Sequence, residues 1–261
     1  MRHGKPLLGY INHLKGAAFS TGSQVQATPA SNLATDVGSD PWQTAGVRTA
    51  AAGAWVEIDA GEERDWSAFW IGRTNLTDEA EVRFLLGSEA GLGDLYDSDW
   101  LAGIEPGYQQ LVHLLGAAVM ARHLRIEIND GDNPDGFVRV GCAYGGPVFQ
   151  PRRGIEYGAS FGVAGMRQDI TTRGGQEYPV PLYQRRQWEV NLRHLTEEEM
   201  FEQGLEIQRA AERGQNVLFV PRPGGRWEQR DTVFGLLRSR ATFGFPHYDL
   251  RSWAFTLSER L

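Results

Sequence analysis

The densest group of potential ligand side chains lies at residues 130–136, which read Asp-Gly-Asp-Asn-Pro-Asp-Gly. Calcium takes about six to eight oxygen ligands, and closely spaced carboxylates on a turn can supply several of them. The candidate ligands are Asp130, Asp132 and Asp135. The helix–loop–helix calcium pattern fails, because Pro134 stands at a ligand position and Gly141 stands where a Glu is needed. A tight turn between two strands explains the same residues, since all four residue types favour turns. A structural calcium ion remains the alternative, and we expect no other cofactor.

A second group of residues has the composition of a sugar-binding surface. Tyr96 and Trp100 enclose two aspartates, and Trp42 lies earlier in the chain. Sugars stack on aromatic rings while carboxylates accept their hydroxyl groups, so Trp42, Tyr96 and Trp100 are candidate glycan-binding residues. The alternative is that these aromatic side chains pack in the core or in loops.

Two pairs of adjacent arginines lie in the second half of the chain. They are Arg152 with Arg153 and Arg185 with Arg186. Such pairs can contact an acidic surface, either of the first half or of a neighbouring subunit, so they are candidate interface residues. Ordinary surface charge is the alternative interpretation.

Known catalytic patterns are absent from the sequence. There is no nucleophile elbow, no His-Glu-x-x-His helix and no phosphate-binding glycine loop. A glycan hydrolase would need two carboxylates about 5–10 Å apart in a groove, and the sequence singles out no such pair. The one cysteine, Cys142, excludes an internal disulfide and a cysteine-based zinc site. We therefore expect a protein that binds or assembles, not an enzyme.

Charge divides the 261-residue chain into two halves. Residues 1–150 hold 19 acidic and 10 basic side chains, whereas residues 151–261 hold 14 and 16. The net charge of −7 argues against general nucleic-acid binding, which needs a basic footprint. No apolar run approaches the roughly 18 residues that span a bilayer. We expect a protein that is made in a cytoplasm and does not insert into a membrane.

Hydrophobic alternation predicts a mainly β protein. In the first half, residues 54–59, 81–86 and 122–128 alternate, and residues 67–72 form a continuous apolar run. Short strands separated by turn residues at this density are typical of an antiparallel sandwich. The pattern also places His123, Arg125 and Glu127 on a face that contacts water.

The second half is predicted to contain one helix among strands. Residues 187–193 alternate, and Thr196 with Glu199 forms a capping box at the start of a helix over residues 197–213. Gly214 is the expected left-handed terminator. The apolar stripe of this helix should include Met200 and Phe201. The predicted division is a lead-in at 1–28, a β-sandwich at 29–146, a linker at 147–160 and a second β domain at 161–261.

The first half resembles a discoidin-type, galactose-binding-like jelly roll. The residues that carry this likeness are 29–33, 41–44, 55–59, 70–76 and 121–126. The continuation resembles a family of tailed-bacteriophage tail proteins, on the basis of residues 133–137, Gly141, Gly146, Pro147, Pro151 and residues 173–176. The order of elements in the second half is similar to the tail-tube-type sandwich with one helix.

These resemblances imply a structural component of the tail tip or baseplate of a phage, made in the host bacterial cytoplasm and located in the virion tail. It would assemble with itself as a ring, a hexamer or a trimer, and contact the tail tube and other tip or fibre proteins. DNA could pass the ring lumen without specific binding. The alternative function is a carbohydrate-binding module or adhesin that recognises a host surface glycan.

Overall fold

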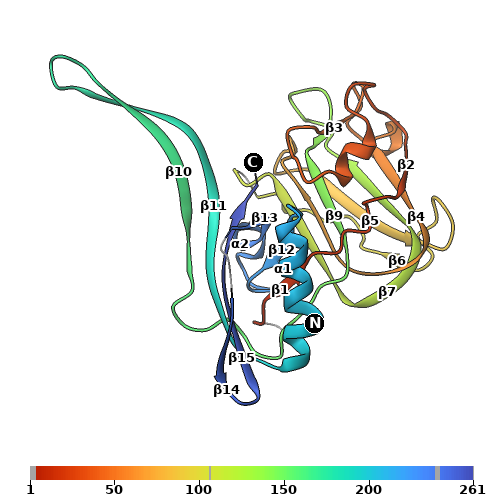
Figure 1. The fold of residues 1–261 in the computed structure, drawn as a ribbon. Coiled ribbons are helices and arrows are strands. Elements are labelled where there is room, and N and C mark those ends of the chain that lie inside the picture. Colours follow the sequence, from red (N-terminus) through yellow and green to blue (C-terminus); the bar gives the residue numbers. More distant parts are fainter. Residues whose placement is uncertain (1–3, 106, 239–241, 261) are drawn as a thin grey trace. The chain divides into compact units, whose positions relative to one another are not determined.

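The computed structural model describes residues 4–105, 107–238 and 242–260. The chain forms two compact units (Figure 1). The first comprises Met1–Gln150 together with Val220–Thr232, and the second comprises Pro151–Phe219 and Val233–Leu261. The segment at 220–232 therefore belongs to the first unit, whereas the sequence analysis placed it in the second domain. Among the described residues, no helix is long and apolar enough to cross a membrane.

The first unit is a β-sandwich, in agreement with the predicted mainly β fold. Its strands are β1 (Leu7–Gly9), β2 (Ala18–Thr21), β3 (Trp42–Gln43), β4 (Trp55–Gly72), β5 (Glu81–Gly87), β6 (Tyr96–Asp97), β7 (Gln110–Asn129), β8 (Arg139–Val140) and β9 (Cys142–Gly146). Its helices are η1 (Ala30–Ala34), η2 (Ala50–Ala52) and α2 (Glu228–Asp231). The main sheet has the order β2-β4-β7-β5-β6, with β9 paired to β4. Strands β1 and β2 lie inside the segment that the sequence analysis set apart as a lead-in.

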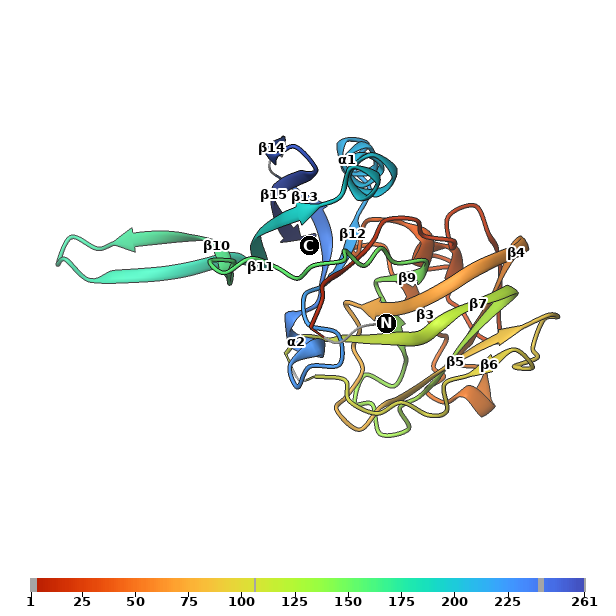
Figure 2. The ribbon, with the colours of Figure 1, turned by 90° about the horizontal axis from the view of Figure 1, so that it is seen from below.

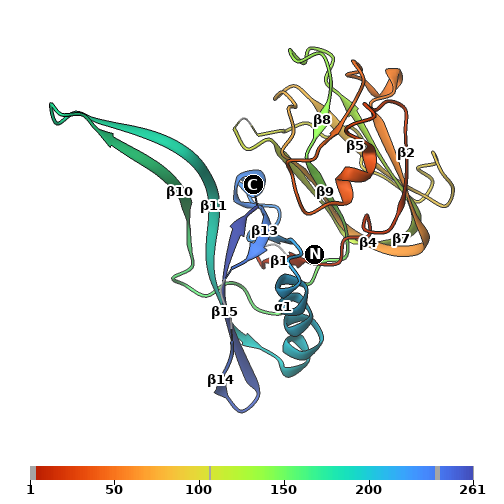
Figure 3. The ribbon, with the colours of Figure 1, turned by 45° about the horizontal axis from the view of Figure 1, so that its top comes forward.

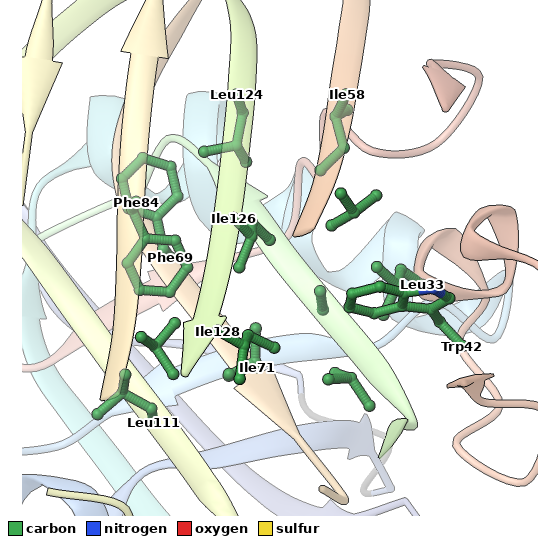
Figure 4. Close-up of a cluster of buried hydrophobic side chains, with 14 of the residues drawn as sticks. Leu33, Trp42, Ile58, Phe69, Ile71, Phe84, Leu111, Leu124, Ile126 and Ile128 are labelled. Atoms are coloured by element: carbon green, nitrogen blue, oxygen red, sulfur yellow. The ribbon is translucent and has the colours of Figure 1, made fainter. Parts of the chain in front are cut away.

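The core of this unit is filled by the inward side chains of the alternating strands (Figure 4). Phe69 and Phe84 stack with their ring centroids 4.9 Å apart, and Ile126 and Ile128 of β7 lie in the same cluster. Trp42 also belongs to this core and is fully buried. The alternation of residues 122–128 thus identified the inward face of this part of β7 correctly.

The second unit contains a sheet with the order β12-β13-β15-β11-β10, and β14 pairs with β15 (Figure 3). Its strands are β10 (Ser160–Thr171), β11 (Glu177–Leu195), β12 (Val217–Val220), β13 (Val233–Leu237), β14 (Phe243–His247) and β15 (Leu250–Glu259). Its helical elements are the π-helical turn η3 (Glu199–Gly204) and α1 (Leu205–Glu212). The core packs Trp188, Phe219 and Phe255 against one another, with centroid separations of 5.9 Å for each successive pair.

The helix begins and ends where the sequence predicted. The Thr196 amide donates to Glu199 Oε2 at 2.8 Å, and the Glu199 amide donates to Thr196 Oγ1 at 3.2 Å, which completes the capping box. Gly214 has a φ of 79° and ends the helix. The predicted stripe is partly wrong, because Met200 is buried as expected but Phe201 is 51% exposed. The π-helical turn η3 changes the angular spacing that a regular α-helix would have given.

Candidate functional site

Trp100 lies on a turn that strand β5 holds in place. The Ser98 amide donates to the Phe84 carbonyl at 3.1 Å, and the Phe84 amide donates to Ser98 Oγ at 2.9 Å. Leu101 exchanges backbone hydrogen bonds of 2.8 and 3.0 Å with Val82. Between these two anchors the chain has little freedom. The turn therefore presents the half-buried Trp100 from a fixed backbone.

Asp99, the residue before Trp100, adopts a left-handed conformation with a φ of 54°. This conformation is uncommon for residues other than glycine, although Asp tolerates it better than most. Its amide donates to Asp97 Oδ1 at 2.9 Å, which stabilises the turn locally. The Asp99 side chain is exposed beside the half-buried tryptophan ring.

Arg83, one strand away, supplies a cation to the same surface. Its Nε donates to Asp97 Oδ1 at 2.8 Å, and its Nη2 also contacts the Asp97 carboxylate. The pKa of Asp97 is lowered, chiefly by this hydrogen bond. The Arg83 guanidinium carbon lies 5.8 Å from the centroid of the Trp100 ring. Sequence reasoning did not select Arg83, although the alternation of residues 81–86 placed it on the outward face of the strand.

The other two predicted glycan-binding residues are placed differently. Trp42 is fully buried and its Nε1 donates to the Ser23 carbonyl at 3.2 Å, so no sugar ring can stack on it. Packing in the core, the alternative interpretation, applies to this residue. Tyr96 is half-buried against the core, and its hydroxyl is 2.6 Å from His113 Nε2. Of the three, Trp100 is the half-buried aromatic residue whose ring lies beside a guanidinium, with the exposed Asp99 next to it.

The outward face of β4 and β7 is more enclosed than the sequence indicated. Glu57 is 5% exposed and His123 is 9% exposed, because the loop after β5 covers this face and the Gly91 amide donates to Glu57 Oε1 at 3.1 Å. Burial raises the pKa of Glu57 above its ordinary value. Arg125 lies between Glu57 and Glu127, at 3.7 and 2.8 Å, and stacks 4.1 Å from the Trp55 centroid. This row of charges is largely neutralised within the unit.

The aspartate-rich segment forms a turn whose first carboxylate is already saturated. Asp130 is 3% exposed and accepts from the Thr77 amide at 3.0 Å, from Thr77 Oγ1 at 2.6 Å and from Asn133 Nδ2 at 2.7 Å. Asp135 accepts from Asn75 at 2.9 Å, and Asp132 is exposed. Within the described ranges, no group of three or more His, Cys, Asp or Glu side chains could hold a metal ion. The turn interpretation accounts for these contacts, and a bound calcium ion stays a prediction.

The four predicted interface arginines range from buried to exposed. Arg186 is buried, and its Nε and backbone amide both donate to Glu259 Oε2, at 3.0 and 3.1 Å. Arg186 thus joins β11 to the last residue of β15 within its own unit, and this burial does not fit the predicted place in a subunit interface. Arg185 is half-buried, with its guanidinium carbon 5.8 Å from the Tyr183 centroid. Arg152, whose Nη2 lies 3.9 Å from Glu198, and Arg153 are exposed.

No family model and no curated protein matches the chain. Among solved structures, it is similar to a family 32 carbohydrate-binding module of C. perfringens NanJ in complex with galactose, at 12% identity and a TM-score of 0.41, covering 54% of this chain and 98% of that one. The lectin domain of lectinolysin complexed with Lewis B antigen gives 13% identity, a TM-score of 0.40, and coverages of 52% and 95%. A fucose-binding module of Streptococcus pneumoniae is 10% identical, with a TM-score of 0.40, and the match covers 52% of this chain and 98% of that one. At these values nothing about a ligand or partner follows from the likeness.

Proposed function

We propose that the first unit is a carbohydrate-binding module, without catalytic activity, whose ligand lies on the turn of Trp100. The observation that carries this proposal is a half-buried tryptophan ring and an exposed carboxylate on one rigid turn, with the guanidinium of Arg83 on β5 beside them. A sugar presents apolar C–H groups on one face and hydroxyl groups around its edge, so it suits an aromatic ring flanked by charged hydrogen-bonding groups.

Each residue has a distinct role in this proposal. The Trp100 ring supplies the apolar platform, and the exposed Asp99 carboxylate accepts hydrogen bonds from sugar hydroxyls. Two N–H groups of Arg83 donate to Asp97, and Nη1 lies 3.7 Å from Glu127 Oε2. Because a guanidinium has five N–H groups, a donor remains for a sugar hydroxyl oxygen. Because backbone hydrogen bonds to β5 fix the turn, little conformational entropy is lost on binding.

The test is binding of neutral and acidic glycans to the full chain, first on an array and then by calorimetry. Galactose and fucose are suitable first probes, since both are named in the structures above. Trp100→Ala should weaken binding at least tenfold, because stacking and area burial are lost together. Trp227→Ala is the matched control, since Trp227 lies in the same unit and is 40% exposed. Absence of binding to every glycan, or equal binding by both variants, would contradict the proposal.

A second candidate function is the structural role in a phage tail tip, with several copies assembled around a channel. The observation that favours it is the long hairpin of β10 and β11, which carries exposed apolar side chains. Exposed apolar surface of this kind is typical of a protein–protein contact. Light scattering at two concentrations tests this role. Three or six times the chain mass of 29.1 kDa would support a ring.

A further inference from the structure

The hairpin of β10 and β11 has two faces whose composition can be read from its register (Figure 2). In an antiparallel pair, opposed residues lie on the same face, and every second residue along a strand shares that face. We call the face that carries Trp188 the inner face and the opposite one the outer face. Near the base, Phe161 opposes Trp188 on the inner face, and their rings stack at 4.6 Å. Ser160 and Gly162 oppose Glu189 and Gln187 on the outer face.

Halfway along the hairpin, a bulge moves the apolar side chains from the inner face to the outer face. Met166 opposes Tyr183 and the next residue, Arg167, opposes Pro181, so Leu182 has no partner in the register. The extra residue moves every following side chain of β11 to the other face. Beyond the bulge the outer face is therefore apolar. This distal outer patch consists of Met166, Ile170, Tyr178, Val180 and Tyr183, each between 40% and 54% exposed, with Gln168 in its middle.

The inner face beyond the bulge is polar. Arg167 and Asp169 lie on it and form an ion pair at 3.3 Å, and the opposed residues of β11 are Pro181 and Pro179. Proline has no amide N–H, so these two positions cannot donate to an added strand along the free edge of β11. Extension of the sheet is therefore disfavoured along this part of β11, whereas β10 keeps a free edge, and the apolar outer face offers a neighbour a surface to pack on.

We propose that the distal outer patch packs against the same patch of a second copy of this chain. The five side chains present on the order of 500 Å² of apolar surface, at the upper end of what soluble monomers leave uncovered. Two such patches bury about 1,000 Å² in total, which is the lower limit for a specific interface. A two-stranded ribbon is only marginally stable alone, and face-to-face packing gives each ribbon a second layer. This proposal does not depend on carbohydrate binding.

A two-fold contact requires the same patch on both copies, and the arrangement on the hairpin is compatible with this requirement. The apolar residues lie on both sides of Gln168, which opposes Val180, so the centre of the patch can face its own symmetry mate. Because the interface is near the lower size limit, we expect a dimer that dissociates on dilution. The association would join two carbohydrate-binding units, and bivalent attachment would then strengthen binding to a surface that carries many glycans.

Disulfide trapping gives the sharpest test, because Cys142 is the sole cysteine and is buried. Gln168→Cys should form a covalent dimer rapidly under mild oxidation. Arg167→Cys is the matched control, since it is the adjacent residue on the inner face and should cross-link at least tenfold more slowly. Equal rates for both variants would overturn the proposal.

The mass in solution provides the second measurement. The unmodified chain should approach twice 29.1 kDa as its concentration rises, and the double variant Tyr178→Ser, Val180→Ser should stay monomeric. Arg167→Ser with Asp169→Ser should still dimerise, which separates loss of the patch from damage to the hairpin. A monomer at all concentrations, binding of the hairpin to neutral phosphatidylcholine vesicles, or a trimer or hexamer would each overturn face-to-face pairing. A ring would favour the second candidate function instead, while glycan binding by the first unit would be unaffected.

Discussion

The sheet of the first unit and the distal hairpin of the second are both antiparallel, yet they expose opposite kinds of side chain. In the first, the apolar side chains of β4, β5 and β7 are enclosed in a core, and the other face carries paired charges such as Arg125 with Glu57 and Glu127. In the second, apolar side chains remain exposed on a two-stranded ribbon. The difference indicates that the first unit is complete in itself and the hairpin is not.

The largest expected effect tests whether enclosed and exposed apolar side chains contribute differently to the free energy of unfolding. Phe84→Ala in the first unit should lower the free energy of unfolding by about 3–5 kcal/mol, because it leaves a cavity beside Phe69. Ile170→Ala on the hairpin should change it by less than about 0.5 kcal/mol, since exposed side chains contribute little. Urea unfolding at a concentration that keeps the chain monomeric measures both. Similar losses for the two variants would show that the hairpin is packed within its own chain.

A smaller effect concerns the aspartate-rich turn at residues 130–136 of the first unit. Asp130→Ala should cost about 2–3 kcal/mol, because the Thr77 and Asn133 donors lose a buried charged acceptor. Asp132→Ala, an exposed neighbour, should be close to neutral. If the unit is complete without an ion, a chelator should leave the melting temperature of the unmodified chain unchanged. A clear fall in melting temperature with chelator, reversed by calcium, would restore the cation interpretation.

The sequence predicted those parts of the fold that depend on residues close together in the chain. The capping box of Thr196 and Glu199 depends on a spacing of three residues, and the inward face of β7 depends on strict alternation. Both were read correctly from the sequence. The alternating sides of Trp55, Glu57 and Val56 were also read correctly, although the covering loop that buries Glu57 was not.

What the sequence could not predict depends on contacts between distant residues or on a single inserted residue. Gln229 packs on β7 by exchanging hydrogen bonds of 2.8 and 2.9 Å with the backbone of Val112, which lies far away in the sequence. Trp42 could not be told from an exposed aromatic residue, because its burial is set by strands that follow it. The bulge at Leu182 moves the following side chains of β11 to the opposite face. An alternating pattern continued through Leu182 therefore does not predict the apolar patch.

The smallest expected effects concern the charges on the outer face of the first unit, and they differ in sign. The pKa of Glu57 is raised by burial, so the stability it contributes is full below its ordinary pKa and is lost as pH rises through the raised value. The pKa of Asp97 is lowered by Arg83, so its contribution is present above its ordinary pKa and is lost as pH falls through the lowered value. Two groups on one face thus respond to pH in opposite directions.

Glu57→Gln and Asp97→Asn separate these two contributions. Relative to the unmodified chain, Glu57→Gln should become more favourable as pH rises from about 4 to 7, because it removes a buried charge. Asp97→Asn should become less favourable as pH rises through a lower window, from about 2 to about 4, by less than about 1 kcal/mol, because its ion pair is partly exposed. Unfolding by urea at several pH values gives both slopes. Slopes of the same sign would mean that the loop containing Gly91 does not enclose Glu57 in solution, and the outer face of the first unit would then be as open as that of the hairpin.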